Sequence, residues 1–506
     1  MGKLGGFLEI HREEKKIREI SDRIKDFNEI DVPLNDEYIK TQAARCMDCG
    51  VPFCHWACPV DNHCPEWQDL VYNGEWKKAL DLLLSTNPFP EFTGRICPAL
   101  CEGSCTLGKN DKPVTTKNIE LALIEKGWKN GWIKPKTPKK RFDKKIAVIG
   151  SGPSGLAAAQ TLNRFGYNVT VYEKSERAGG LLALGIPDFK LDKKIIDRRV
   201  KLMEEEGVKF IYNTEAGKDI SNEELEKGFD IILMSCGSKQ ARDLNIKGRE
   251  AKGVYLAMDF LTQQNRKVNN IPLYNEEIDV KGKNVLVIGG GDTGSDCVGT
   301  SVRQGAASVK QIEILNKPSE TRTSKNPWPQ FPMYLKTSTS HKEATEVYGN
   351  DPREWNITTK EFIKDENGEF DVPDNKEISM KLPKGLIPKS PDGNLDVTTN
   401  LRVDSSFVED EGWHKASKSY YNFLEENKNK HILFLELGVG ANTPVIIKYP
   451  FWQMTKSNEK AVYACINYGA AFCPMEIENR SICIDGDIRE VLNSILKLPV
   501  AKIVSL

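Results

Sequence analysis

The sequence predicts an α/β protein that begins with a helical, cysteine-rich segment and ends in an α/β tail. Eight of its thirteen cysteines lie before residue 106. The pattern Gly-x-Gly-x-x-Gly occurs twice, near residues 150 and 290, each time directly after a short apolar run. Each copy opens a helical segment that leads to a second apolar run, which is the β-α-β order of a Rossmann-type unit. Two tandem Rossmann-type units are therefore expected between the cysteine-rich segment and the tail.

Composition narrows the class of protein. At 506 residues, 39% hydrophobic and 28% charged, the chain can bury several cores. Seventy-one basic residues against seventy-two acidic ones create no overall field that favours nucleic acid or an anionic membrane as a partner. The amino terminus, "MGKLGGFLEIHREEKKIREISDRIKDF", contains no apolar run of signal-peptide or membrane-span length. We expect a cytoplasmic protein.

The amino-terminal cysteines require a local explanation. The stretch "RCMDCGVPFCHWACP", followed downstream by "RICPALCEGSC", contains seven of them: Cys46, Cys49, Cys54, Cys58, Cys97, Cys101 and Cys105. A reducing cytosol argues against disulfides, which leaves metal or redox chemistry. Structural zinc typically uses two CxxC pairs, whereas one CxxC followed by wider gaps and a proline is closer to an iron–sulfur run. Iron–sulfur clusters are favoured, with structural zinc as the alternative, and Cys64 is expected to be a buried thiol rather than a ligand.

The first glycine-rich loop has the full dinucleotide-binding context. An apolar run, Ile146 to Ile149, precedes a helix, and a second strand ends at Glu173. The three glycines of the loop are Gly150, Gly152 and Gly155. They permit a tight turn and close approach to a pyrophosphate, and the helix N-terminus supplies positive potential. A carboxylate at Glu173 can bind ribose hydroxyls and would repel a 2′-phosphate, so the expected ligand is FAD or NAD.

The second loop follows a strand from Val285 to Ile288, and the next strand is expected to end near Leu315. Its glycines are Gly289, Gly291 and Gly294. We expect no carboxylate at this strand end, where Asn316 and Lys317 stand, and Arg322 shortly after it suits the 2′-phosphate of NADPH. The first site is thus expected to reject a 2′-phosphate and the second to bind one. Together they predict a relay of electrons from NADPH through a flavin to the clusters. The alternative is that the second copy is a decayed Rossmann unit.

Several long motifs carry a resemblance to a known family. They are "GFLEIHREEKKIREISDRIKDF", "QAARCMDCGVPFCH", "NPFPEFTGRICPALCEGSC", "VIGSGPSGLAAA", "GGLLALGIPDFKL", "KQARDLNIKGREAKGVYLAMDFL", "NPWPQFP" and "NITTKEFIKDENG". Over residues 5 to about 370 the chain resembles the small (beta) subunit of NADPH-dependent glutamate synthase. In that family the small subunit takes hydride from NADPH onto FAD. Electrons then pass through iron–sulfur clusters to a large (alpha) subunit, where 2-oxoglutarate and glutamine-derived ammonia become glutamate.

The resemblance also implies cofactor contacts. It implies two 4Fe-4S clusters, the first held by Cys46, Cys49, Cys54 and Cys105, and the second by Cys58, Cys97, Cys101 and Glu120. Further nucleotide contacts are expected at Gly180, Asp292 and Thr293. In this family a returning strand with a Gly-Asp pair closes over the flavin, and no segment after residue 370 matches it. FAD is therefore expected to bind weakly.

The tail resembles a different family. Residues 375 to about 497, in "NLRVDSSFVEDEGWHKASKSYYNFL", "HILFLELGVGANTPVIIKYPFWQMT" and "AVYACINYGAAFCPMEIENRSICIDGDIREVLNSIL", resemble the C-terminal half of sirtuins of the macrodomain-associated branch. The resemblance implies NAD as a ligand of the tail, at Gly438, Gly440, Asn442 and Asn467. The N-terminal sirtuin half and a zinc-binding CxxC are not found. His414 and His431 do not stand in the sequence context of the catalytic base.

The expected domains are a helical iron–sulfur domain (1–140), an FAD unit (141–280), an NADPH unit (281–372) and a sirtuin-like half-domain (373–506). The expected function is NADPH-dependent electron input to a glutamate synthase large subunit, with neither nucleic acid nor membrane as a partner. One alternative is a related flavoprotein that feeds ferredoxin or another reductase partner. Another is an NAD-binding, sirtuin-like protein in which the tail carries the function.

Overall fold

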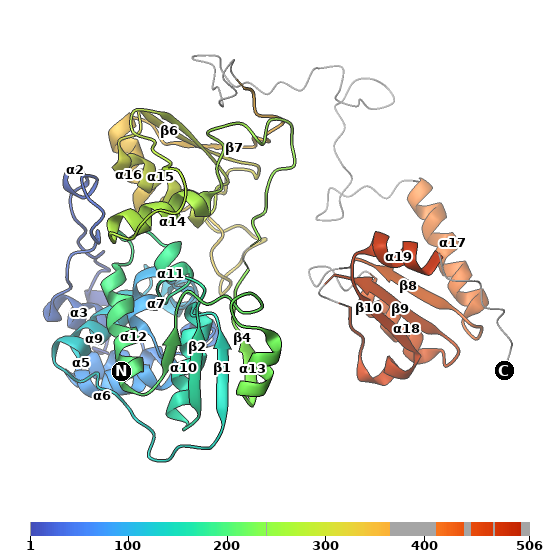
Figure 1. The fold of residues 1–506 in the computed structure, drawn as a ribbon, viewed down its shortest axis with the longest axis horizontal. Coiled ribbons are helices and arrows are strands. Elements are labelled where there is room, and N and C mark those ends of the chain that lie inside the picture. Colours follow the sequence, from blue (N-terminus) through green and yellow to red (C-terminus); the bar gives the residue numbers. More distant parts are fainter. Residues whose placement is uncertain (1, 239, 365–410, 440–446, 469–470, 497–506) are drawn as a thin grey trace. The chain divides into compact units, whose positions relative to one another are not determined.

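The computed structural model describes residues 2–238, 240–364, 411–439, 447–468 and 471–496. The chain divides into two compact units, Met1–Met380 and Lys381–Leu506 (Figure 1). Within the described residues, no helix combines the length and the apolar character that crossing a membrane requires.

The first unit begins with a helical domain whose core surrounds Trp67. Its longer helices are α3 (Asp36–Ala43), α5 (Cys64–Tyr72), α6 (Trp76–Thr86), α7 (Pro90–Ile96) and α9 (Thr116–Lys129). Short turns lie between them: α1 (Gly6–Glu9), α2 (Ile20–Arg23), α4 (Phe53–Trp56), α8 (Leu100–Gly103) and the 3₁₀ turn η1 (Thr106–Lys109). Helix α6 forms because Ala79, Leu80 and Leu83 make one buried stripe. Among the first eight cysteines, Cys54, Cys64 and Cys101 lie in helices and the others lie in the connections, so irregular backbone gathers the thiols.

The next part of the unit is a parallel sheet of order β3-β2-β1-β4. Its strands are β1 (Lys145–Ile149), β2 (Asn168–Tyr172), β3 (Lys209–Ile211) and β4 (Ile231–Met234). Its helices are α10 (Pro153–Arg164), α11 (Leu181–Leu184), α12 (Lys193–Glu205) and α13 (Asn222–Gly228). Val148 and Val171 pack against α10 and α12, whereas Ala147 and Ile149 pack against Leu225 of α13. Helices therefore cover both faces of the sheet, as expected for a doubly wound unit.

A second parallel sheet has the order β5-β6-β7. Its strands are β5 (Asn284–Ile288), β6 (Ser308–Glu313) and β7 (Arg353–Trp355), and its helices are α14 (Ala257–Val268), α15 (Asp292–Gln304) and α16 (Thr339–Tyr348). Val287, Val298 and Val309 form its core with Phe260. The predicted α/β fold, with a helical cysteine-rich domain followed by two Rossmann-like units, is confirmed.

The second compact unit is a smaller α/β layer with the parallel strand order β10-β9-β8. It consists of α17 (Glu411–Asn427), β8 (Leu433–Leu437), α18 (Lys448–Ser457), β9 (Val462–Asn467), η2 (Met475–Arg480), β10 (Ser481–Asp485) and α19 (Ile488–Leu496). Its core contains Phe434, Tyr463 and Cys465. A buried ion pair joins Lys448 to Glu436 at 2.6 Å. The tail is thus α/β, as predicted.

Candidate functional site

Four thiols line one pocket of the helical domain. Its cysteines are Cys46, Cys49, Cys54 and Cys105, and the remaining wall is largely apolar, with Phe53, Leu107 and Val114. Cys46 follows α3, Cys54 lies in α4 and Cys105 follows α8. Burial raises the pKa of the Cys46 thiol to about 12, so a bound metal centre is needed to hold it as a thiolate. The donor set and the apolar wall fit an iron–sulfur cluster. We call these four cysteines the first set.

The second set consists of Cys58, Cys97, Cys101 and Glu120. Cys58 and Cys97 each interact electrostatically with Cys101 and with Glu120, so the four side chains are neighbours. Glu120 lies in α9, is 6% exposed, and accepts hydrogen bonds from Thr93 and from Asn87 Nδ2. Burial raises the pKa of its carboxyl to about 7. A buried carboxyl beside three thiols fits a ligand set for a cationic metal centre.

Cys64 lies between the two sets. It is 1% exposed, and the neighbouring thiols of Cys101 in the second set and Cys54 in the first, together with burial, raise the pKa of its thiol well above the usual value. The prediction of a buried thiol is confirmed. Its position was not predicted, because no spacing rule in the sequence relates Cys64 to Cys101.

The first glycine-rich loop has the geometry of a pyrophosphate cradle. A Cβ at Gly155 would lie 2.0 Å from Gly150 O, and one at Gly150, where φ is +100°, would lie 2.5 Å from Ser235 O. Gly152 is the N-cap of α10 and supplies no capping side chain, which leaves the first N–H groups of the helix for an anion. Gly180 is equally constrained, because its Cβ would lie 2.8 Å from Gly152 Cα.

The carboxylate of Glu173 stands at the end of β2, as predicted. Its Oε2 accepts hydrogen bonds from Ser151 N (3.1 Å) and Ser151 Oγ (2.5 Å), and its Oε1 accepts one from Ser175 N (2.9 Å). Burial pushes the pKa of Glu173 upward, but these hydrogen bonds outweigh it and hold the pKa below its usual value. The group is therefore a fixed carboxylate beside the loop.

The second loop also has a carboxylate at the end of its second strand, so the prediction that none stands there is wrong. Strand β6 ends at Glu313, whose Oε2 accepts a hydrogen bond from Gly290 N (2.7 Å) and whose Oε1 accepts one from Leu315 N (3.0 Å). A carboxylate thus stands at this strand end, and Asn316 and Lys317 lie beyond it. The register explains the difference, because β6 pairs with β5 only as far as Ile312 opposite Ile288. The separation of 23 residues between Gly290 and Glu313, against 22 between Ser151 and Glu173, was the missed signal.

Other residues of the second loop lie where they were expected. Gly289 has φ +117°, and a Cβ at Gly294 would lie 2.3 Å from Gly289 O. Gly291 caps α15. Asp292 and Thr293 open that helix and are exposed. The loop therefore presents a helix N-terminus as the first loop does.

Arg322 is engaged elsewhere in the structure. Its Nη2 donates to Gly103 O and its Nη1 to Gln330 O, both at 2.7 Å. The surrounding segment, residues 319–335, also contacts the cysteine-rich turns: Ser104 Oγ donates to Pro329 O at 2.6 Å, and the Trp328 ring lies 4.5 Å from that of Phe53. Arg322 thus joins the second Rossmann-like unit to the end of α8.

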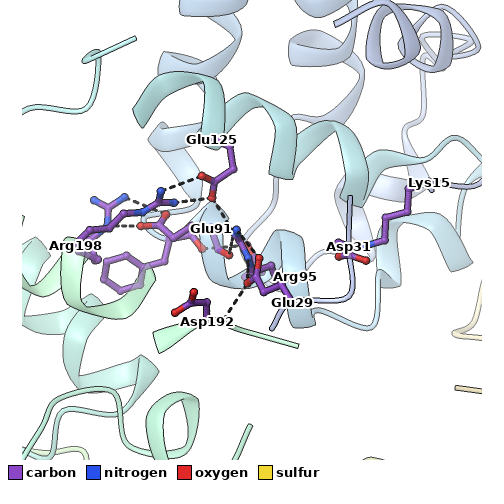
Figure 2. Close-up of polar contacts among 11 residues, drawn as sticks. Lys15, Glu29, Asp31, Glu91, Arg95, Glu125, Asp192 and Arg198 are labelled. Carbon is purple, nitrogen blue, oxygen red and sulfur yellow. Dashed lines mark hydrogen bonds and ion pairs between the residues drawn. The ribbon is translucent and has the colours of Figure 1, made fainter. Parts of the chain in front are cut away.

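Charged side chains join the helical domain to the first Rossmann-like unit (Figure 2). Arg198 of α12 binds Glu125 of α9 at 2.6 Å, and Arg95 of α7 binds both Glu125 (2.8 Å) and Glu29 (2.7 Å). Arg199, the next residue of α12, forms a fully buried bidentate pair with Glu91 of α7, at 2.6 and 3.0 Å. Helix α7 leads to Cys97, and helix α9 carries Glu120. The arginines of α12 therefore bind the two helices that position the second set.

The residues predicted in the tail are only partly described. Gly438 has φ +69°, and its N–H donates to Ile466 O at 3.0 Å. Asn467 Nδ2 donates to Val439 O at 2.9 Å. Gly440 and Asn442 lie outside the described residues. His414 and His431 are exposed.

Comparison with known proteins agrees with this geometry. Residues 23–132 match the family model "dihydropyrimidine dehydrogenase domain II, 4Fe-4S cluster", and residues 144–327 match "pyridine nucleotide-disulphide oxidoreductase". The fold and the sites define an NAD(P)H-dependent oxidoreductase with FAD-binding and iron–sulfur domains. The chain is 50% identical to the "glutamate synthase [NADPH] small chain" of Bacillus subtilis, over 73% of this chain and 77% of that one. It belongs to the glutamate synthase small chain family.

Two further relatives support this assignment. The "glutamate synthase [NADPH] small chain" of Mycobacterium tuberculosis is 46% identical over 71% of this chain and 73% of its own length. The "glutamate synthase [NADH]" of Schizosaccharomyces pombe is 48% identical over 73% of this chain but only 18% of its own length. The name of the Mycobacterium tuberculosis relative gives NADPH as the nucleotide, and that of the Schizosaccharomyces pombe relative gives NADH.

Proposed function

We propose that the chain supplies electrons from NADPH to a glutamate synthase large subunit for the synthesis of glutamate. FAD bound at the first glycine-rich loop would supply the exchange of a hydride for single electrons, and the two cysteine sets would hold 4Fe-4S clusters that carry single electrons. The observation that carries the proposal is the first set, four thiols lining one pocket within the same compact unit as a dinucleotide-type loop. A ferredoxin or another reductase as acceptor is the alternative.

The site residues have separate roles in this proposal. The first set holds one cluster, and the second set, with Glu120 as its non-cysteine ligand, holds the other. Gly150, Gly152, Gly155 and Gly180 bind FAD with Glu173, and Gly289, Gly291, Asp292, Thr293 and Gly294 bind the nicotinamide nucleotide. The proposed domains are residues 1–140, 141–280, 281–372 and 373–506. The short helix α4 carries Cys54 of the first set, and its neighbour α8 carries Cys101 of the second set. The electron path between the two clusters is therefore short.

The test is direct. The chain, purified without oxygen, is assayed for iron, acid-labile sulfide and flavin, and is then mixed with NADPH and the large subunit of the Bacillus subtilis enzyme. We expect both iron and sulfide, paramagnetic signals on reduction, and glutamate formed from glutamine and 2-oxoglutarate. Stoichiometric zinc without sulfide would contradict the cluster assignment. Reduction without glutamate formation, but with electron transfer to ferredoxin, would favour the alternative acceptor.

Nucleotide preference is expected to depend on Glu313 rather than on Arg322. NADPH is supported by the names of the small-chain relatives, yet Glu313 occupies the ribose-binding position and should admit NADH as well. Glu313→Gln should raise the ratio of kcat/KM for NADPH to that for NADH by about 10- to 150-fold, because one charge-assisted hydrogen bond is worth about 1.5–3 kcal/mol. Arg322→Ala should lower both values equally, since its partners are carbonyl groups of the protein. If Arg322→Ala instead lowers kcat/KM for NADPH alone, Arg322 binds the 2′-phosphate.

Flavin content is expected to be low in this 506-residue chain. Strand β4 lies at the end of its sheet, and Ile231 and Met234 on it are 52% and 66% exposed. No segment of the first unit's described residues covers them as a returning strand would. Loss of several polar contacts at about 1 kcal/mol each would weaken the binding of FAD by orders of magnitude. Quantifying the flavin released from purified protein should give well under one per chain, with slow bleaching by NADPH. One tightly held, rapidly reduced FAD would show that another segment closes the site.

The tail is proposed to bind NAD through Gly438, Gly440, Asn442 and Asn467, on the strength of its sequence resemblance to sirtuins. The hydrogen bond from Asn467 to Val439 O supports this, because it ties Asn467 to the residue directly after Gly438. Both family models end before residue 328, so neither covers the tail. The test is calorimetric titration with NAD. Binding heat that Asn467→Ala abolishes and Glu313→Gln leaves in place would assign NAD binding to the tail.

A further inference from the structure

We propose that the helical domain holds a divalent cation, zinc, at His55, His63 and Glu66, none of which belongs to either cysteine set. His55 lies in α4, His63 is the N-cap of α5, and Glu66 lies in the first turn of that helix. His55 Nε2 lies 3.7 Å from Glu66 Oε2, and His63 Nδ1 lies 4.0 Å from Glu66 Oε1. One ligand atom from each residue fits within a span of 4.8 Å.

The surroundings of the three side chains leave their ligand atoms available. The buried His55 Nε2 atom has no hydrogen-bond partner, which is costly for an imidazole nitrogen unless an ion or water meets it. The His55 and His63 rings meet edge to face, with centroids 4.5 Å apart. Among the described residues, no lysine or arginine forms an ion pair with Glu66, whose side chain is 50% exposed. The cluster therefore has a free buried nitrogen and an open side.

The distances suit a small tetrahedral cation. Zinc binds imidazole nitrogen and carboxylate oxygen at about 2.0–2.2 Å, which places neighbouring ligand atoms about 3.3 Å apart. The separations of 3.7 and 4.0 Å exceed this by about 0.4 and 0.7 Å, and the three ligand atoms lie within 4.8 Å of one another, so rotation of the side chains has to bring them together around the ion. Two imidazoles and one carboxylate leave a fourth position for water, a donor set that favours zinc over magnesium or calcium. Bound there, the ion would tie α4 to the start of α5 and so fix Cys54 in α4 and Cys58 in the connection that follows it.

The test uses the cluster-loaded chain. Protein purified without oxygen is dialysed against micromolar Zn²⁺ and analysed for zinc and iron, and the zinc environment is read by X-ray absorption. We expect one zinc per chain with iron unchanged, and nitrogen or oxygen neighbours at about 2.0–2.1 Å. His63→Gln should weaken zinc binding at least about tenfold, because it removes a direct ligand. The matched control His11→Gln changes an exposed histidine of the same domain and should bind zinc as the parent does.

Three outcomes would overturn the proposal. One is a sulfur shell at about 2.3 Å, which would place the zinc on cysteines. Another is equal zinc uptake by the parent and His63→Gln, and the third is no uptake by the parent. If His63→Gln loses iron or fails to fold, Glu66→Gln serves in its place, because Glu66 is half exposed and its replacement keeps the side-chain volume.

Discussion

Cys49→Ser is expected to remove about one of the two clusters and to loosen the cysteine-rich turns. Cys49 lines the pocket of the first set with three other thiols, and loss of one ligand commonly abolishes a cluster site. The turns around it are short: α4 and α8 have four residues each, too few to be stable without a metal centre or tertiary packing. Iron and sulfide should fall from about eight to about four of each per chain, and limited proteolysis should cut between α3 and α5.

The matched control is Cys483→Ser. Cys483 is exposed and lies in β10 of the second compact unit, so its replacement should leave iron, sulfide and the proteolysis pattern unchanged. Unchanged iron in Cys49→Ser would remove Cys49 from the ligand set. Equal losses in the two variants would mean that the purification rather than the ligand determines cluster content.

Glu91→Ala is expected to destabilise the first compact unit by about 3–5 kcal/mol, because it leaves a buried guanidinium without its partner. The side chains of Arg199 and Glu91 are 2% and 0% exposed. The Arg199 guanidinium also lies 5.4 Å from the Phe89 ring and 5.2 Å from that of Trp128, so water cannot easily replace the carboxylate. Urea unfolding followed by tryptophan fluorescence measures the effect. Electron transfer from flavin to the clusters should also slow, since α7 leads directly to Cys97.

Two controls separate burial from charge. Lys77→Ala breaks an exposed pair with Asp81 on α6 and should cost less than about 1 kcal/mol. The double variant Glu91→Leu/Arg199→Met replaces both charges by apolar groups and should recover much of the loss. A Glu91→Ala effect no larger than that of Lys77→Ala would mean that water reaches Arg199 and that the pair does not hold the two domains together.

Much of the candidate site could be predicted because its signals are local. The cysteine spacings, both glycine-rich loops and Glu173 lie on short stretches, where turn and helix geometry depend on neighbouring residues. The grouping of Cys105 with Cys46 required a resemblance to a known family, because it depends on how distant turns meet. Glu313 was missed although its spacing was regular. The end of β6 was placed by its apolar run, which continues through Ile314 and Leu315, whereas strand pairing ends earlier.

By itself, the sequence determined the class of the protein: two dinucleotide-type loops and a cysteine-rich domain, each written in residues close together along the chain. Only the tertiary structure decided which groups those residues face. It placed Cys64 between the two cysteine sets, turned Arg322 toward Gly103, and paired Glu91 with Arg199 across 108 residues. It also brought His55, His63 and Glu66 together from two helices. Such contacts depend on the packing of separate elements, and spacing along the chain does not encode which polar atoms meet when water is excluded from between them.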